Sequence, residues 1–156
     1  LSQMRAPSTK AGRDPVPDVA VIEPMRGRSE QPLPAAGLLV FTPQDIQLVL
    51  QSFPSGPERL RKLYLAEVYR GILHDREIAI VGPALGAPQT VMILEKLIAL
   101  GLQDVVALGW CGSLQPHVQI GDVVLPTGAI SEEGTSVHYP LGSAQPGPAP
   151  GLLGAL

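Results

Sequence analysis

The feature that most constrains the fold is a strand, a long helix and a second strand in direct succession between Glu77 and Leu108. The segment "PQTVMILEKLIALG" predicts the helix, because apolar residues recur at helical spacing and Gly101 lies where a glycine cap ends a helix. The segment "DVVALGW" has no charge after Asp104 and is typical of a strand buried on both faces. This order predicts a βαβ unit in a parallel or mixed sheet, and hence a three-layer α/β/α fold. The apolar helix face is expected to comprise Val91, Ile93, Leu94, Leu97 and Ile98.

The preceding segments add further elements to this sheet. The run "GLLVF" at residues 37–41 predicts a short strand, and Thr42 and Pro43 suit the N-cap and the first position of a helix. The apolar face of that helix is expected to comprise Ile46, Val49 and Leu50. Two strands are predicted at residues 63–73 and 77–82, although the first segment also fits a helix.

The chain divides into three parts by composition. Residues 1–36 are rich in proline with scattered charges, which predicts a flexible leader. Residues 37–141 carry the regular pattern of the folded domain. Residues 142–156 read as a Pro/Gly loop followed by the start of a helix, so the domain is expected to be truncated at the C-terminus.

Composition narrows the classes of partner and the cellular compartment. A net charge of −3 and a pI near 5.5 give no electrostatic reason to expect nucleic acid or a membrane surface as partner. The single cysteine excludes an intrachain disulfide and fits a reducing compartment. Since no signal peptide or membrane-spanning run is visible, a cytoplasmic protein is expected.

Three loops should meet at one edge of the predicted sheet. They are "FTPQD" at residues 41–45, "GPALGAP" at residues 82–88 and "GWCGS" at residues 109–113, each following a strand. Ligands of such sheets bind beyond the carboxyl ends of the strands, so a small polar ligand is expected there, lying against main chain. A dinucleotide is rejected because the glycine spacing is Gly-x-x-x-Gly and Asp104 begins the next strand, too far from a bound ribose.

Residues 82–139 read "GPALGAPQTVMILEKLIALGLQDVVALGWCGSLQPHVQIGDVVLPTGAISEEGTSVHY". This stretch resembles the nucleoside phosphorylase and nucleosidase superfamily, which includes uridine and purine nucleoside phosphorylases and methylthioadenosine/S-adenosylhomocysteine nucleosidase. The order of the glycine-rich loop, the helix, the Gly-x-x-Gly turn and the Gly-Asp-Val strand is similar throughout, and the resemblance covers residues 37–141. It implies a phosphorylase/hydrolase-like fold that binds a nucleoside and cleaves its N-glycosidic bond, after which phosphate or water adds to the sugar.

The resemblance also bears on the nucleophile. Similar phosphorylases bind phosphate through a Gly-Asp-Pro-x-Arg turn and through an Arg and a Thr beside Gly-x-x-Gly. Here the turn ends in Asp45, and the other two positions read Ala107 and Trp110. Guanidinium groups that suit a phosphate dianion are therefore missing, and a carboxylate would repel it. Similar nucleosidases activate water with a Glu near this position, so hydrolysis is favoured with Asp45 as catalytic base. The competing role of Asp45, and the more usual one for an acidic residue at this position, is to stabilise the first turn of its helix.

The predicted substrate-binding residues are Thr42, Gly82, Gly86, Ala87, Trp110, Cys111 and Gly112. The backbone of Gly112 is expected to lie against the base, because a glycine allows the ring to approach. Trp110 is expected either to stack on a base or, as the favoured reading, to plug the space that phosphate occupies in relatives. A buried and inert thiol is expected at Cys111. Asp122 is expected to begin a strand and to hold the backbone amides of the preceding turn.

No cofactor is expected, and no metal site, because His74, His117 and His138 are not spaced as ligands. The expected partners are a nucleoside and, by resemblance, a second copy in a homo-oligomer. Two alternatives stay open: phosphorolysis with an anion site rebuilt from Arg70, Arg76 or a neighbouring subunit, and an inactive nucleoside-binding domain.

In the family the groups that grip the sugar and protonate the base lie beyond the matched stretch. Residues 1–156 alone are therefore expected to have no useful catalytic rate. The sequence does not specify the base or the sugar.

Overall fold

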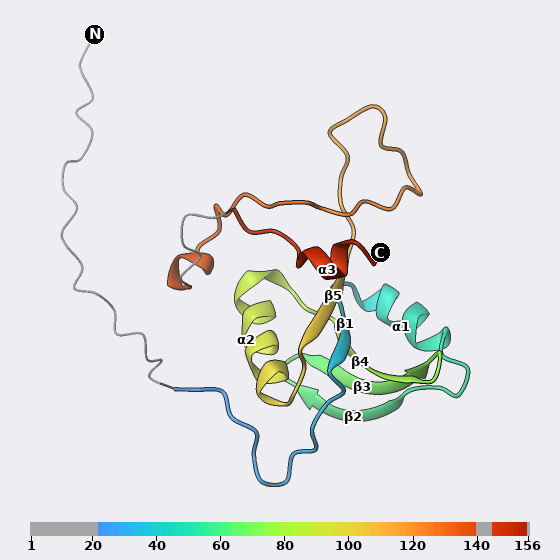
Figure 1. Cartoon of the computed structure of the whole chain (residues 1–156), viewed down its shortest axis with the longest axis vertical. Helices are drawn as coiled ribbons and strands as arrows, with labels where there is room; N and C mark the ends of the chain where they lie inside the picture. Colours follow the sequence, from blue (N-terminus) through green and yellow to red (C-terminus); the bar gives the residue numbers. More distant parts are fainter. Residues whose placement is uncertain (1–21, 140–144, 156) are drawn as a thin grey trace, which may run out of the picture.

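The computed structural model describes residues 22–139 and 145–155, which form one five-stranded sheet in the order β2-β3-β4-β1-β5 (Figure 1). In chain order the elements are β1 (Ala36–Val40), α1 (Pro43–Gln51), β2 (Glu58–Leu63), β3 (Ala66–Leu73), β4 (Arg76–Gly82), α2 (Gly86–Ala99), β5 (Asp104–Leu108), the 3-10 turn η1 (Ser136–His138) and α3 (Pro150–Leu153). β1 pairs in parallel with β4 and β5, whereas β2, β3 and β4 pair antiparallel. The predicted mixed sheet is confirmed, and the short helix α3 lies within the segment where the start of a helix is predicted.

The two long helices cover opposite faces of this sheet. Leu39 packs in an apolar cluster with Ile93 and Leu97 of α2, whereas its neighbour Val40 packs in a second cluster with Ile46 of α1. Because successive residues of a strand point to opposite faces, the two clusters lie on opposite sides of β1. Figure 1 shows α2 and α1 on either side of the central strands. The predicted three-layer α/β/α arrangement is confirmed.

The start of α1 forms as the sequence predicts. Thr42 is its N-cap with extended backbone, and Pro43 occupies the first turn. The Asp45 backbone N–H donates to Thr42 Oγ1 at 3.4 Å, so a local contact satisfies one of the free amides of the helix end.

The segment at residues 63–73, predicted as one strand, spans the last residue of β2, a turn and the whole of β3. Tyr64, with φ 55°, lies in the turn between β2 and β3, and His74 and Asp75 form the next turn with φ 48° and 62°. Both φ values are positive in the latter turn, as a tight hairpin with matched twist requires. β2 escaped prediction because its sequence "ERLRKL" is mostly charged, which is common in a strand at the edge of a sheet.

The prediction that β5 is buried on both faces is wrong. β5 pairs only with β1 and forms an edge of the sheet, where Ala107 and Leu108 are exposed. Ile98, predicted for the apolar face of α2, is likewise exposed, although Ile93 and Leu97 are buried as expected. No strand within residues 22–139 and 145–155 pairs with the outer side of β5.

Beyond β5 the described chain is irregular apart from η1 and α3. The strand predicted at Asp122 is absent, and Ile120 and Val123 are exposed. A strand needs a partner for its backbone groups, and no described segment supplies one here. The turn itself forms as predicted, because Asp122 Oδ2 accepts a hydrogen bond from the Gln119 backbone N–H at 2.8 Å.

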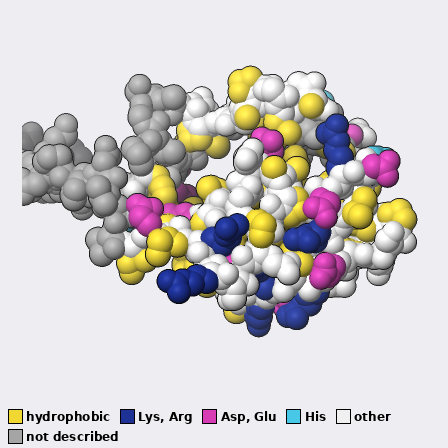
Figure 2. All heavy atoms as spheres, turned by 60° about the horizontal axis from the view of Figure 1, so that its bottom comes forward, with side chains coloured by type: hydrophobic (Ala, Val, Ile, Leu, Met, Phe, Trp, Pro, Cys, Tyr) yellow, Lys and Arg dark blue, Asp and Glu magenta, His cyan; other side chains and the backbone are white. Residues whose placement is uncertain are grey.

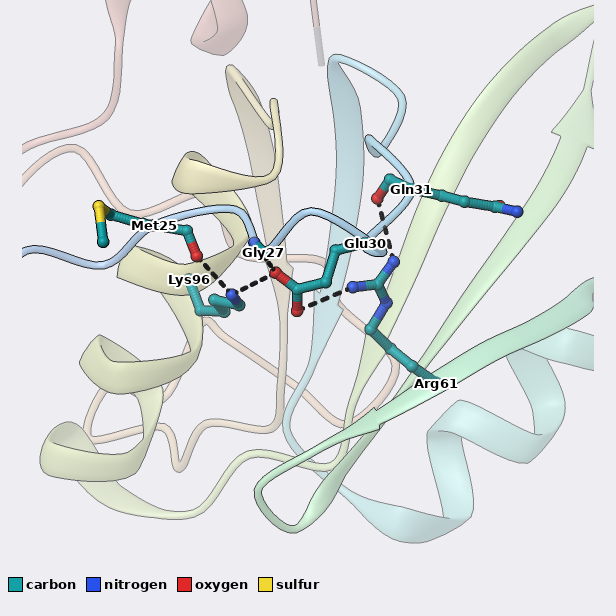
Figure 3. Close-up of polar contacts among 6 residues, drawn as sticks. All are labelled: Met25, Gly27, Glu30, Gln31, Arg61 and Lys96. Carbon is teal, nitrogen blue, oxygen red and sulfur yellow. Dashed lines mark hydrogen bonds and ion pairs between the residues drawn. The ribbon is translucent and has the colours of Figure 1, made fainter.

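Residues 25–35, here called the strap, are bound at the end of the sheet where the strands β1 and β5 begin. Figure 3 shows Glu30 between Lys96 of α2, at 2.6 Å, and Arg61 of β2, at 3.1 Å. Glu30 also accepts the Gly27 backbone N–H at 2.6 Å. The hydrogen bond from Lys96, followed by that from Gly27, lowers the pKa of the Glu30 carboxyl group, so this group is charged at neutral pH.

Three basic side chains also donate to backbone carbonyls of the strap. Lys96 reaches Met25 O at 2.6 Å, Arg61 reaches Gln31 O at 3.0 Å, and Arg70 donates to the carbonyl of Pro32 at 3.3 Å. Leu33 is buried, and its N–H donates to Leu100 O at 2.8 Å. The prediction of a flexible leader over residues 1–36 is therefore wrong for the strap, while residues 1–21 lie outside the described part of the chain.

Two features of the described chain concern helix length and surface charge. No helix within the described residues is long and apolar enough to cross a bilayer. On the face seen in Figure 2, Lys and Arg side chains are interspersed with Asp and Glu, so no extended patch of one sign covers it.

Candidate functional site

Three parallel strands end at one edge of the sheet, here called the carboxyl edge. β1 ends at Val40, β4 at Gly82 and β5 at Leu108, and the three predicted loops leave from these positions. The Phe41 backbone N–H donates to Leu108 O at 3.0 Å, which ties the first loop to the third. The predicted convergence of the three loops is confirmed.

Gly82 has a packing role at this edge. A Cβ atom built on Gly82 would lie 2.4 Å from the carbonyl oxygen of Val40, far inside van der Waals contact. The absence of a side chain therefore lets β4 and β1 approach each other directly beneath the loops.

Three of the predicted site residues meet at the carboxyl edge. Asp45 Oδ2 accepts a hydrogen bond from the Thr42 hydroxyl and another from Trp110 Nε1, the latter at 2.6 Å. Its other oxygen, Oδ1, accepts no hydrogen bond from any described residue. Asp45 thus joins the N-terminal turn of α1 to the loop that follows β5.

The contact between Trp110 and Asp45 is the part of the site that sequence reasoning missed. The two residues are 65 positions apart, and the patterns assigned Trp110 to a base or to a plugged cavity. The only signal in the sequence was the predicted convergence of the two loops that carry these residues, and that convergence does not pair individual side chains. Trp110 is 80% exposed, so it does not fill a closed space as the plug prediction requires.

Gly86 and Ala87 lie at the same edge, in the first turn of α2. Gly86 has φ 70°, a backbone conformation that favours glycine, and its carbonyl accepts the Thr90 hydroxyl at 2.7 Å. The Leu85 N–H donates to Gln89 Oε1 at 2.8 Å, which satisfies one amide before the helix. Among the described residues no hydrogen bond joins this turn to Asp45 or Trp110.

Cys111 and Gly112 lie in the irregular segment beyond β5. The prediction of a buried thiol is wrong, because Cys111 is exposed. Gly112 is exposed too, and a Cβ atom on it would meet nothing within 4 Å. Their proposed contact with a base stays a prediction.

The two arginines predicted as parts of a rebuilt anion site lie away from Asp45 and Trp110 or bind another segment. Arg76 begins β4, a seven-residue strand whose other end forms the site, so it lies roughly 20 Å away along the strand. Arg70 donates to Pro32 O in the strap. Within this chain, neither residue supports the phosphorolytic alternative.

Other polar clusters of the described chain lie apart from these residues. Hydrogen bonds from the Ser136 side chain and from the backbone amides of Thr135 and Ser136 lower the pKa of Glu133 to about 2, and Glu133 thereby orders η1. A surface hollow of about 410 Å³ is lined by the strap and β2, and another of about 300 Å³ by residues 126–129 and 146–148. No group of three or more His, Cys, Asp or Glu side chains gathers as a metal site within residues 22–139 and 145–155.

The fold and the loops at its carboxyl edge define an α/β protein whose candidate site lies where parallel strands end. The chain belongs to the phosphorylase superfamily, because the model of that family matches residues 35–156.

Curated relatives and solved structures agree with this membership. A uridine phosphorylase from Klebsiella aerogenes is 29% identical over 115 residues, which is 65% of this chain and 46% of the relative. A guanosine phosphorylase from Halorubrum lacusprofundi is 36% identical over 63 residues, covering 40% of this chain and 26% of the relative. The purine nucleoside phosphorylase from Toxoplasma gondii in complex with immucillin-H has the same fold, with a TM-score of 0.74, 22% identity and coverage of 84% of this chain and 56% of that one. The chain thus spans about half the length, or less, of these relatives.

Proposed function

We propose that the chain carries the nucleophile side of a site that cleaves the N-glycosidic bond of a nucleoside, with water as the nucleophile. The similarity to uridine and guanosine phosphorylases supports a nucleoside as substrate. The observation that carries the choice of water is the Asp45 carboxylate, held by Thr42 and Trp110 at the carboxyl edge.

The proposed step follows from the two oxygens of this carboxylate. Oδ2 is engaged by two donors, so Oδ1 is the oxygen that accepts a proton from water. The water oxygen bonds to the anomeric carbon of the sugar, the bond from that carbon to the base nitrogen breaks, and its electron pair leaves with the base. The base takes up a proton from solvent, and the products are the free base and the free sugar.

A phosphate nucleophile meets two obstacles at this place. At about 4 Å, two like charges near a protein surface repel each other by roughly 4 kcal/mol, and Asp45 supplies one of them. The other obstacle is that no Lys or Arg of residues 22–139 and 145–155 forms an ion pair with Asp45: Arg59 donates to Glu67 in β3, while Arg61 and Arg70 donate to the strap.

Phosphorolysis is the second candidate, because the similar proteins are named phosphorylases. An assay on the protein translated from its complete reading frame distinguishes the two. Uridine, guanosine and adenosine are incubated with and without inorganic phosphate, and free sugar and sugar 1-phosphate are quantified. We expect base release to be independent of phosphate, with free sugar as product.

The variant Asp45→Asn is expected to lower kcat about 10²- to 10⁴-fold, as loss of a general base does. The matched control is Asp122→Asn, which alters a carboxylate that holds only its own turn. Release of base that requires phosphate and yields sugar 1-phosphate would overturn the hydrolytic proposal in favour of the second candidate.

A further inference from the structure

We propose that Trp110 determines which nucleophile the site accepts, because its indole N–H holds the Asp45 carboxylate where that charge excludes an anion. This inference rests on the proposed function and adds to it a residue that sets specificity. Trp110 acts through Asp45 and is therefore a positioning residue.

The geometry fixes the carboxylate from two sides. The Thr42 hydroxyl reaches Oδ2 from the N-cap of α1, and Trp110 Nε1 reaches the same oxygen from the loop after β5, at 2.6 Å. A free Asp side chain changes rotamer readily, whereas two donors on one oxygen leave a single orientation. The negative charge is thereby kept between the ends of β1 and β5.

The backbone before Trp110 is itself held beside α1. A Cβ atom on Gly109 would lie 2.9 Å from Cδ2 of the Phe41 ring, so the chain passes close to that ring. The Phe41 N–H donates to Leu108 O at 3.0 Å, which fixes the residue before Gly109. These contacts position the backbone before Trp110 so that its side chain reaches Asp45, and they do not involve the exposed residues after Trp110.

An anion is excluded by the negative charge of Asp45 and by the lack of free side-chain donors in this cluster, and not by the size of the Trp110 side chain. Since Trp110 is 80% exposed, it leaves the space around Asp45 open to a small molecule. A neutral water can enter that space and bind Oδ1. An anion finds the two side-chain donors of this cluster, Thr42 Oγ1 and Trp110 Nε1, already bonded to a carboxylate.

The test uses inorganic phosphate alone, with sodium chloride at matched ionic strength and without nucleoside. Trp110 is the only tryptophan in the sequence given, so the ¹⁵N-labelled chain should show one indole N–H resonance. This resonance reports on the hydrogen bond from Trp110 Nε1 to the Asp45 carboxylate. We expect this resonance to move in Asp45→Asn before any ligand is added, and to be insensitive to phosphate in the wild type. Asp122→Asn is the control that should leave it in place.

Phosphate affinity is then measured by calorimetry in the wild type, Asp45→Asn and Trp110→Phe. Trp110→Phe keeps an aromatic ring but lacks the N–H, so the carboxylate retains only the Thr42 hydroxyl as a side-chain donor. We expect phosphate to bind both variants at least about tenfold more tightly than the wild type. Trp110→His, which restores a ring N–H, should recover part of the exclusion.

Two results would overturn the inference. One is a wild type that binds phosphate as tightly as Asp45→Asn. The other is a Trp110→Phe variant that excludes phosphate as well as the wild type does. Both readouts are independent of turnover, so a protein that excludes phosphate but cleaves no nucleoside would contradict the proposed function alone.

Discussion

At the scale of single residues, Gly82 gives the sharpest test of the packing beneath the site. The variant Gly82→Ala places a methyl group 2.4 Å from the backbone oxygen of Val40, which cannot rotate away as a side chain would. We expect a loss of about 1–3 kcal/mol in the free energy of unfolding, measured by urea denaturation. Gly112→Ala is the matched control, because its methyl group would meet nothing within 4 Å. Equal stabilities of the two variants would contradict this account.

Residue roles that depend on neighbours in sequence were predictable, and those that depend on distant segments were not. The Thr42 cap and the place of Asp45 in the first turn of α1 follow from a local pattern. The bond between Asp45 and Trp110 joins two strand ends, and pattern alone does not pair side chains across them. Cys111 was expected to be buried because thiols usually are, but its segment has no cover among the described residues.

At the scale of elements, the strap is expected to depend on Glu30. The variant Glu30→Gln keeps the side chain's shape but removes the charge that Lys96 and Arg61 share. Trypsin should then cleave after Arg26 and Arg28 about two- to fivefold faster, as expected from the loss of partly exposed ion pairs.

The cleavage rate is followed by mass spectrometry at neutral pH. Glu23→Gln is the control, because Glu23 is exposed and has no hydrogen bond or ion pair to any described residue. If Glu30→Gln and Glu23→Gln were cleaved at the same rate, the ion pairs would not be what holds the strap.

Elements with a long apolar period were predicted well, and edge strands were not. The helix α2 and its flanking strands carry enough periodic residues to define a βαβ unit. β2 was missed because charges replace its alternation, and β5 was assigned to the interior because its sequence is apolar. The order of strands in a sheet decides which strands are edges, and a local pattern does not encode that order.

At the scale of the whole molecule, the two edges of the sheet differ in chemistry. The edge strand β2 is mostly charged, with the sequence "ERLRKL". The other edge strand, β5, reads "DVVAL" and has no charged residue after Asp104. Edge strands that lack charged side chains tend to pair with strands of other chains, so the wild type should self-associate through β5.

Sedimentation of the chain at several concentrations checks this expectation. Ala107→Lys places a charge on β5 and should lower association, whereas Gln103→Lys adds the same charge just before the strand and should not. Unchanged association in Ala107→Lys would point to another surface.

The three layers and the carboxyl edge were predictable because they follow from the order of a few strongly patterned segments. The path of the chain after β5 was not, since residues 109–130 contain apolar positions such as Leu114, Ile120 and Ile130 that are exposed here. An extended apolar segment acquires a defined conformation only with a surface to pack on, and that surface is not encoded within the segment itself.

The strap and the candidate site lie at opposite ends of β1, and this has a practical consequence for biosensor work. A linker attached at Ser29, exposed on the strap, would tether the molecule to a chip with Asp45 facing the flowing sample. A maleimide surface would instead capture the lone thiol of Cys111, next to Trp110, and press that end against the matrix. The choice of coupling chemistry thus decides whether an injected small molecule can reach the candidate site.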